Sequence, residues 1–270
     1  MNETRNDPAG DDPFARLSYR RLIAWPARMR RETPFLEAAL AAAPDRSAVD
    51  LGCGPGEHAR LLASWGVRTL GIDRSESMIE QAREHEGEFG AAGPRFVLGP
   101  IESLAVADDD RFGAAFSLGN VLPYLEDDEL PRALAAVAAA LLPGGVFAGQ
   151  LLNYGPILAG EVRSLPLNVR PDPADDAAEI LFLRPLKPDG DGRHALFFPT
   201  TLHLVPGADP PVRIERTKEV RVRAWTWPEL DAALEAAGFD ERRAYGDVER
   251  AEFAPDASSD LVFTARRAPR

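Results

Sequence analysis

Short apolar runs alternate with helix-like segments through the first half of the chain. Residues 47–51, 67–73, 96–101, 112–118 and 146–152 are the apolar runs that predict buried strands. Helices are predicted at 57–65, from about Ser77, where Ser77-x-x-Glu80 resembles a capping box, and after the acidic residues 126–129 up to Pro143. Strands that alternate with helices in this way predict a doubly wound, mostly parallel sheet with helices on both faces.

The last third of the chain has a different pattern. Residues 180–186, 195–205 and 212–223 are strand-like, and the Asp189–Gly192 stretch is a turn signal between two of them. A helix at 227–237 and strands at 243–248 and 261–264 follow. We therefore expect a core formed by residues 1–152 and 224–270, with an antiparallel insertion at 153–223. The polar residues 1–12 are expected to be disordered.

Composition and charge narrow the possible partners. The 270 residues include 31 Lys and Arg against 43 Asp and Glu, a formal net charge of −12. That charge disfavours nucleic acid and anionic membranes, which would repel the chain. The single cysteine, Cys53, excludes an internal disulfide, and no Cys/His cluster with metal-ligand spacing is present. We therefore expect no metal site. Because no apolar run is long enough to span a bilayer, we expect a cytoplasmic protein.

The strongest chemical signal is the segment Val49-Asp50-Leu51-Gly52-Cys53-Gly54-Pro55-Gly56. A buried strand ends in three alternating glycines, and a helix starts directly after them. Glycines let the backbone approach a ligand closely, and open α/β sheets bind ligands at this edge. Asp73 ends the next strand, where a carboxylate can accept hydrogen bonds from ribose hydroxyls. Asp50 could bind an ammonium group or orient the loop.

The residue after the glycines bears on the kind of ligand. A dinucleotide fingerprint, G-x-G-x-x-G, would place its third glycine at position 57, but Glu57 stands there. A carboxylate at a helix N-terminus repels a pyrophosphate, which such a helix end otherwise attracts. The sequence therefore favours a nucleoside without phosphates and disfavours a nucleotide-dependent oxidoreductase.

These residues resemble class I S-adenosylmethionine (SAM) methyltransferases over at least 47–152, and again near 226–267. The resemblance implies a Rossmann-like, seven-stranded sheet, with SAM as cofactor and S-adenosylhomocysteine as product. It implies that the glycines border the methionine and ribose, that Asp73 binds the ribose, and that Met78 lines the adenine. Pro100 occupies the position of a common acidic adenine ligand, so Ile101 and Glu102 are the remaining candidates. By this resemblance, the cofactor-binding residues are Asp50, Gly52, Gly54, Gly56, Asp73, Met78, Ile101 and Glu102.

Three further stretches resemble glycine and sarcosine N-methyltransferases and their small-molecule relatives. They are Trp25-x-x-Arg28-x-x-x-Glu32, residues 117–124 (SLGNVLPY) and residues 150–154 (QLLNY). In that group an N-terminal arginine pairs with the SAM carboxylate, and Arg28 is the candidate here, since a guanidinium donates two parallel hydrogen bonds. Leu118 and Asn120 are the further cofactor-binding candidates from these stretches.

The implied reaction is methyl transfer to a small molecule by direct displacement. Tyr124, Asn153 and Tyr154 follow strands four and five and are the candidate catalytic residues, which would position the acceptor; no base is assigned. An amine nitrogen is slightly favoured as acceptor, with O-methylation as one alternative and a SAM-binding sensor or partner subunit without turnover as another. The insertion at 153–223 would act as a substrate lid. The sequence leaves the oligomeric state open.

Overall fold

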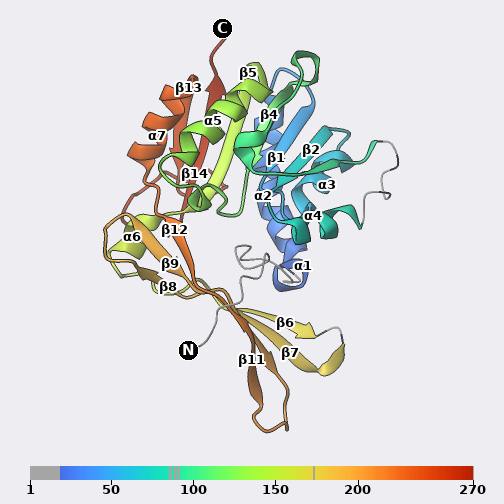
Figure 1. The fold of residues 1–270 in the computed structure, drawn as a ribbon, viewed down its shortest axis with the longest axis vertical. Helices are drawn as coiled ribbons and strands as arrows, with labels where there is room; N and C mark the ends of the chain where they lie inside the picture. Colours follow the sequence, from blue (N-terminus) through green and yellow to red (C-terminus); the bar gives the residue numbers. More distant parts are fainter. Residues whose placement is uncertain (1–18, 85–86, 88–89, 91, 173, 270) are drawn as a thin grey trace, which may run out of the picture.

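A seven-stranded sheet forms the centre of the protein in this computed structural model, which describes residues 19–84, 87, 90, 92–172 and 174–269 (Figure 1). Its strand order is β13-β14-β5-β4-β1-β2-β3. The strands are β1 (Ser47–Leu51), β2 (Arg68–Asp73), β3 (Arg95–Leu98), β4 (Phe112–Ser117), β5 (Leu141–Leu152), β13 (Phe239–Tyr245) and β14 (Asp260–Arg267). Strands β1 to β5 are parallel, and β14 is antiparallel to both neighbours. This confirms the predicted seven-stranded, mostly parallel sheet; the expected disordered segment 1–12 lies outside the described residues.

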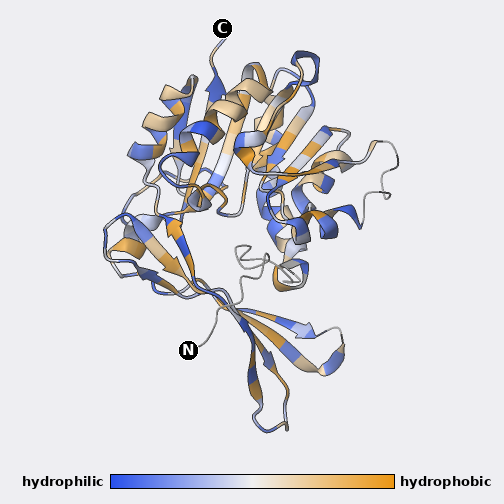
Figure 2. Ribbon diagram, in the orientation of Figure 1, coloured by the Kyte–Doolittle hydropathy of each residue, from blue (hydrophilic) through white to orange (hydrophobic). Residues whose placement is uncertain are grey.

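Helices cover both faces of the sheet, because strand side chains alternate between two apolar layers. Helices α2 (Trp25–Ala41), α3 (Glu57–Ser64) and α4 (Glu76–Arg83) lie on one face, and α5 (Glu129–Ala140) and α7 (Trp227–Ala236) on the other. In β1, Ala48 packs with α2, whereas Val49 and Leu51 pack with α5. The central strands β4 and β5 are accordingly apolar along most of their length in Figure 2. A short helix α1 (Tyr19–Leu22) precedes α2.

The edges of several elements differ from the expectation. Helix α4 is capped by Ser75, whose Oγ accepts the Met78 N–H at 3.3 Å, so the capping box predicted at Ser77 is wrong. Strand β3 ends at Leu98 rather than at 101, and residues 101–103 form a 3₁₀ turn after Pro100. Helix α6 (Tyr154–Leu158), directly after β5, was not predicted. These differences lie at the edge of the sheet, where loops leave the strands.

Residues 168–223 form two small antiparallel sheets rather than one. Their strands are β6 (Asn168–Asp172), β7 (Asp175–Leu183), β8 (Leu186–Pro188), β9 (His194–Phe197), β10 (Thr200–Leu204), β11 (Val212–Thr217) and β12 (Val220–Arg223). The orders are β11-β10-β7-β6 and β12-β9-β8. The four-stranded sheet projects away from the core in Figure 1. The turn predicted at Asp189–Gly192 joins β8 to β9 and is confirmed.

Each of the three long strands predicted in this region is divided at the same level. Leu183 pairs with Thr200 in the larger sheet, and Leu186 pairs with Phe197 in the smaller one. The divisions fall at 184–185, 198–199 and 218–219, and two of them contain a proline, which cannot donate to a ladder. The chain therefore crosses from one sheet to the other three times, and the three crossings lie side by side.

A buried arginine joins the smaller sheet to the core. Arg223 is 1% exposed, its Nε donates to Asp127 at 2.9 Å, and its Nη2 donates to Glu229 at 2.5 Å. Its guanidinium lies 4.2 Å from the ring centre of Trp225, whose Nε1 donates to the Leu125 carbonyl at 3.1 Å. The end of β12, the loop before α5 and the start of α7 are thus tied together.

We expect Arg223→Met to lower the free energy of unfolding by about 3 kcal/mol, because it removes a buried guanidinium together with its contact with the Trp225 ring. The Arg193 and Ala224 carbonyls, to which Arg223 Nη1 donates, also lose that donor. The matched control is Arg132→Met, whose ion pair with Asp128 is more than half exposed on both sides and should be worth less than about 1 kcal/mol. Urea denaturation measures both. Equal losses for the two variants would contradict this account of Arg223.

Candidate functional site

A cavity of about 400 Å³ lies at the carboxyl ends of β1, β2, β3 and β4. Its walls come from those strand ends, from α2 and from the segment before α5. The lining residues are Trp25, Arg28, Gly52, Cys53, Gly54, Pro55, His58, Asp73, Arg74, Ser75, Met78, Gly99, Pro100, Ile101, Glu102, Leu118, Gly119, Val121, Tyr124, Leu125 and Glu129. The volume is typical of a small-molecule site. The sheet order changes direction between β1 and β4, where open α/β sheets bind ligands.

The glycine loop after β1 forms the floor of this cavity. Gly52 has φ +63°, and a Cβ there would lie 2.5 Å from a methyl carbon of Val121. Gly54 has φ +53° and no atom within 4 Å of the Cβ position, so its backbone opens onto free space. Both positions require glycine, one for close packing and the other for its left-handed conformation. A ligand can therefore contact the loop backbone directly at Gly54.

Asp73 fixes this loop to the second strand. Its Oδ2 accepts the Gly54 N–H at 2.8 Å, and its Oδ1 accepts the Ser75 N–H at 2.8 Å. An ionised carboxylate offers about four acceptor positions, so these two bonds are compatible with further hydrogen bonds to a ligand. The carboxylate predicted to bind ribose thus lies in the cavity wall, beside the glycine loop.

Asp50 lies behind the loop rather than in the cavity wall. Its side chain is 1% exposed, and its Oδ2 accepts no hydrogen bond from the described residues. Burial, with the neighbouring charge of Asp73, raises the pKa of Asp50 to about 6, although the charge of His58 opposes this shift. Both roles predicted for Asp50 therefore stay predictions.

Arg28 lines the cavity from α2, as the resemblance implies for a cofactor ligand. Its Nε donates to Glu32 at 2.9 Å, and the other Glu32 oxygen lies 2.6 Å from His58 Nε2. The spacing Trp25, Arg28, Glu32 places these side chains on one face of the helix. That spacing was available in the sequence, although a role for Glu32 was not predicted.

Most of the other predicted cofactor residues line the cavity. Met78, Ile101, Glu102 and Leu118 are among the lining residues. Glu102 Oε2 is buried and accepts no hydrogen bond from the described part of the chain. A buried acceptor without a donor is costly, so this oxygen suits a ligand N–H. Arg74 and Glu129 also line the cavity and were not predicted.

The predicted acceptor-positioning residues are divided by the structure. Tyr124 lines the cavity, whereas Asn153 and Tyr154 are not among its lining residues, and neither is Asn120, which was predicted to bind the cofactor. Asn120 Nδ2 donates to the Tyr154 hydroxyl at 2.9 Å, and burial raises the pKa of that phenol, which keeps it protonated. Asn153 caps α6 and donates to the Pro255 and Ser258 carbonyls. Asn120 and Tyr154 hold the ends of β4 and β5 together, and Asn153 joins the end of β5 to the segment before β14. A direct role for these three residues stays a prediction.

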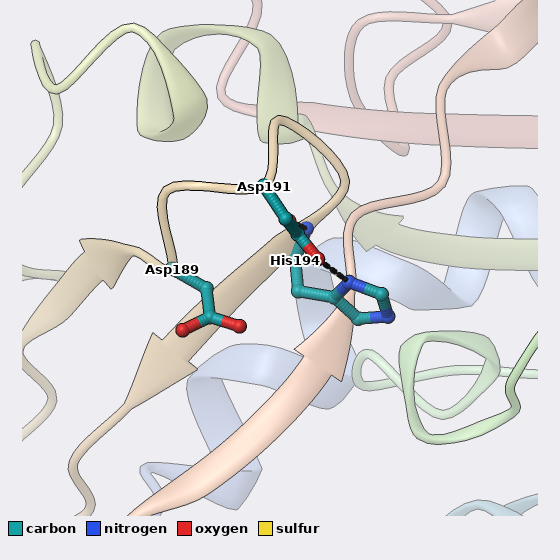
Figure 3. Close-up of side chains that lie close together, drawn as sticks. All are labelled: Asp189, Asp191 and His194. Atoms are coloured by element: carbon teal, nitrogen blue, oxygen red, sulfur yellow. Dashed lines mark hydrogen bonds and ion pairs between the residues drawn. The ribbon is translucent and has the colours of Figure 1, made fainter.

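A separate polar cluster lies at the start of β9. Asp189, Asp191 and His194 lie close together, and His194 Nδ1 is 2.6 Å from Asp191 (Figure 3). The guanidinium of Arg221 donates to Asp189 at 2.7 Å and to Asp191 at 2.8 Å. Because an arginine already supplies the positive charge between these carboxylates, we interpret the cluster as an ion-pair network that stabilises the β8–β9 turn.

Comparison with known proteins agrees with this geometry. Residues 48–145 match the family described as "Methyltransferase domain". A trans-aconitate 2-methyltransferase of Delftia acidovorans is 36% identical over 125 residues, which cover 45% of this chain and 43% of that protein. Residues 48–145 are therefore similar to a methyltransferase domain, which agrees with the resemblance recognised in the sequence. The first curated relatives are matched over only 36% to 53% of their own length.

Solved structures extend the likeness beyond the methyltransferase domain. The CcbJ methyltransferase from Streptomyces caelestis is 26% identical with a TM-score of 0.67, over 90% of this chain and 96% of that one. SAM-bound CalS10, an amino pentose methyltransferase from Micromonospora echinaspora, has the same fold at 21% identity, with a TM-score of 0.66, over 91% and 97% of the two chains. No helix among the described residues is both long and apolar enough to cross a bilayer.

We expect Asp50→Asn to remove a pH-dependent cost from the ligand-free protein. Because the folded pKa of about 6 exceeds the ordinary value of 3.8, the cost is absent below pH 4 and complete above pH 6. The stability gained by the variant over wild type should therefore grow by about 2 kcal/mol from pH 4.5 to pH 7.5. Chemical denaturation across that range, with the exposed Asp109→Asn as control, measures the difference. A pH-independent gain would contradict the raised pKa.

Proposed function

We propose that the chain is a SAM-dependent methyltransferase that acts on a small molecule. The observation that carries the proposal is the cavity itself, in which an open glycine backbone, the carboxylate of Asp73 and the guanidinium of Arg28 face one volume. SAM presents a ribose without phosphates at one place and an α-carboxylate at another. A carboxylate for the hydroxyls and an arginine for the carboxylate match those two groups.

The cavity residues fit the remaining parts of the cofactor in the same way. Met78 and Ile101 supply apolar surface for the adenine, and Glu102 Oε2 supplies an acceptor for its amino group. Arg28 and the backbone at Gly54 would hold the aminoacyl end. SAM brings an activated methyl group, so the protein's tasks are to hold the acceptor in line with the C–S bond and to exclude water.

The cavity favours an amine nitrogen as the methyl acceptor. Asp73, Glu102 and Glu129 line the cavity and provide a negative field that attracts an ammonium group. That group gives its proton to bulk water before it enters, so the neutral amine reacts without a base in the cavity. A hydroxyl acceptor would need a base within hydrogen-bond reach. His58 is the one imidazole among the described lining residues, and its Nε2 is held by Glu32. Tyr124 is the lining group that we assign to position the acceptor.

We also propose that residues 153–223 act as a lid that selects the acceptor. The support is the connection from this insertion to the cavity wall. Arg223 and Arg193 bind Asp127, just after the lining residues Tyr124 and Leu125, and Trp225 holds the Leu125 carbonyl. A movement of the insertion would therefore shift the cavity wall at Tyr124 and Leu125, where we expect the acceptor to bind.

We expect Asp73→Ala to weaken SAM binding about 100-fold, because two hydrogen bonds from ribose to a charged acceptor are lost. Titration calorimetry measures the affinity, and Asp256→Ala, an exposed carboxylate distant in sequence, is the control. Asp73→Asn keeps one acceptor oxygen and should give a smaller loss. Unchanged affinity in Asp73→Ala would exclude the ribose role.

Turnover is tested with methyl-labelled SAM and matched pools of small amines and small hydroxyl compounds. We expect label in an amine product, and nitrogen attachment identified by mass spectrometry. Label in an ether or ester would establish the O-methyltransferase alternative. Tight SAM binding without product from either pool would favour a sensor or partner subunit.

A further inference from the structure

A chain of three polar side chains connects the cavity to the two helices that flank it. Glu32 on α2 is 6% exposed and does not line the cavity, whereas its partners Arg28 and His58 do. One Glu32 oxygen accepts from Arg28 Nε at 2.9 Å, and the other lies 2.6 Å from His58 Nε2. Both oxygens of a buried carboxylate are therefore engaged by groups of the cavity wall.

The protonation of this chain follows from its contacts. Burial alone would raise the pKa of Glu32, but the hydrogen bonds and charges of His58 and Arg28 outweigh burial and lower that pKa to about 2. An ionised carboxylate only accepts hydrogen bonds, so His58 Nε2 carries the proton in this contact. Glu32 thus accepts one charge-assisted bond from each side.

Glu32, Gly119 and Trp25 lie around the Arg28 guanidinium and restrict its orientation. Glu32 holds Nε on one side, and the terminal nitrogen Nη2 lies 3.1 Å from the place that a Cβ on Gly119 would occupy. The ring centre of Trp25 lies 5.2 Å from the guanidinium carbon. An arginine side chain has several rotatable bonds, and holding it before a ligand arrives removes that ordering cost from binding.

We propose that Glu32 is a positioning residue for the cofactor's carboxylate, which it serves through Arg28, and that His58 fixes Glu32 in turn. This inference rests on the proposed function, because it takes Arg28 as the carboxylate ligand. Glu32 does not touch the cofactor. Supporting groups of this kind hold a ligand-binding side chain in its productive geometry, and their loss weakens only the contacts of that side chain.

The alternative is that Glu32 only staples α2 to α3. Trp25 also packs edge-on against His58, at 5.8 Å between ring centres, so the two helices have a second contact. A staple would affect every ligand of the cavity alike. A positioning residue would affect only ligands that carry the carboxylate.

Two ligands separate these cases when they are titrated into the 270-residue chain. S-adenosylhomocysteine has the α-carboxylate, and 5′-methylthioadenosine has the same nucleoside and sulfur without it. In Glu32→Gln we expect about 10- to 50-fold weaker binding of S-adenosylhomocysteine and less than about twofold change for methylthioadenosine. Glu37→Gln, on the exposed side of the same helix, is the matched control and should bind both ligands as wild type does.

A double-variant cycle shows whether Glu32 acts through Arg28. Arg28→Met should itself discriminate against S-adenosylhomocysteine, and adding Glu32→Gln to it should cause no further loss. His58→Phe should repeat the Glu32→Gln pattern more weakly, and His58→Gln, which keeps an N–H donor, should restore binding. The His58 pair also tests the chain if Glu32→Gln folds poorly.

Three results would count against the account at different levels. Equal weakening of both ligands, or additive losses in the cycle, would overturn the positioning role of Glu32 and leave SAM binding intact. An Arg28→Met variant with unchanged affinity for S-adenosylhomocysteine would remove Arg28 as carboxylate ligand, and the inference with it. A wild-type protein that binds neither ligand would overturn the proposed function itself.

Discussion

The hydrogen bond from the Gly54 N–H to Asp73 is the contact on which the site depends. It joins the turn after β1 to the end of β2, and it holds left-handed backbone that only glycine adopts without strain. Helix α3 starts at the end of that turn, so the same bond sets where the helix N-terminus and His58 lie. One carboxylate thereby shapes the floor of the cavity and presents its oxygens to the ligand.

The other walls are placed by ion pairs between segments far apart in the chain. Glu32 joins α2 to α3 beside the glycine loop, and Arg223 joins the end of the insertion to the loop before α5. The side chains of Glu32 and Arg223 are both buried, and an unpaired charge at either position would be costly. The cavity is therefore bounded by elements that side-chain ion pairs hold against one another.

Much of this fold could be predicted because its signals are local. Five apolar runs, the glycines at 52, 54 and 56, and the acidic residue at 73 each lie within a few residues of the feature they indicate. The insertion was harder to predict, because strand periodicity does not reveal that three strands bend at one level into two sheets. The role of Asn153 in capping α6 depends on the Pro255 and Ser258 carbonyls, more than 100 residues away. Likewise, Glu32 and His58 meet only after α2 has packed on α3.

The most direct test of the central claim is a crystal structure of the protein with S-adenosylhomocysteine. We predict the ribose hydroxyls within hydrogen-bond distance of Asp73, the backbone of Gly54 against the ligand, and the carboxylate paired with Arg28. A ligand bound elsewhere, or a ribose turned away from Asp73 with the glycine loop closed over by side chains, would contradict the account.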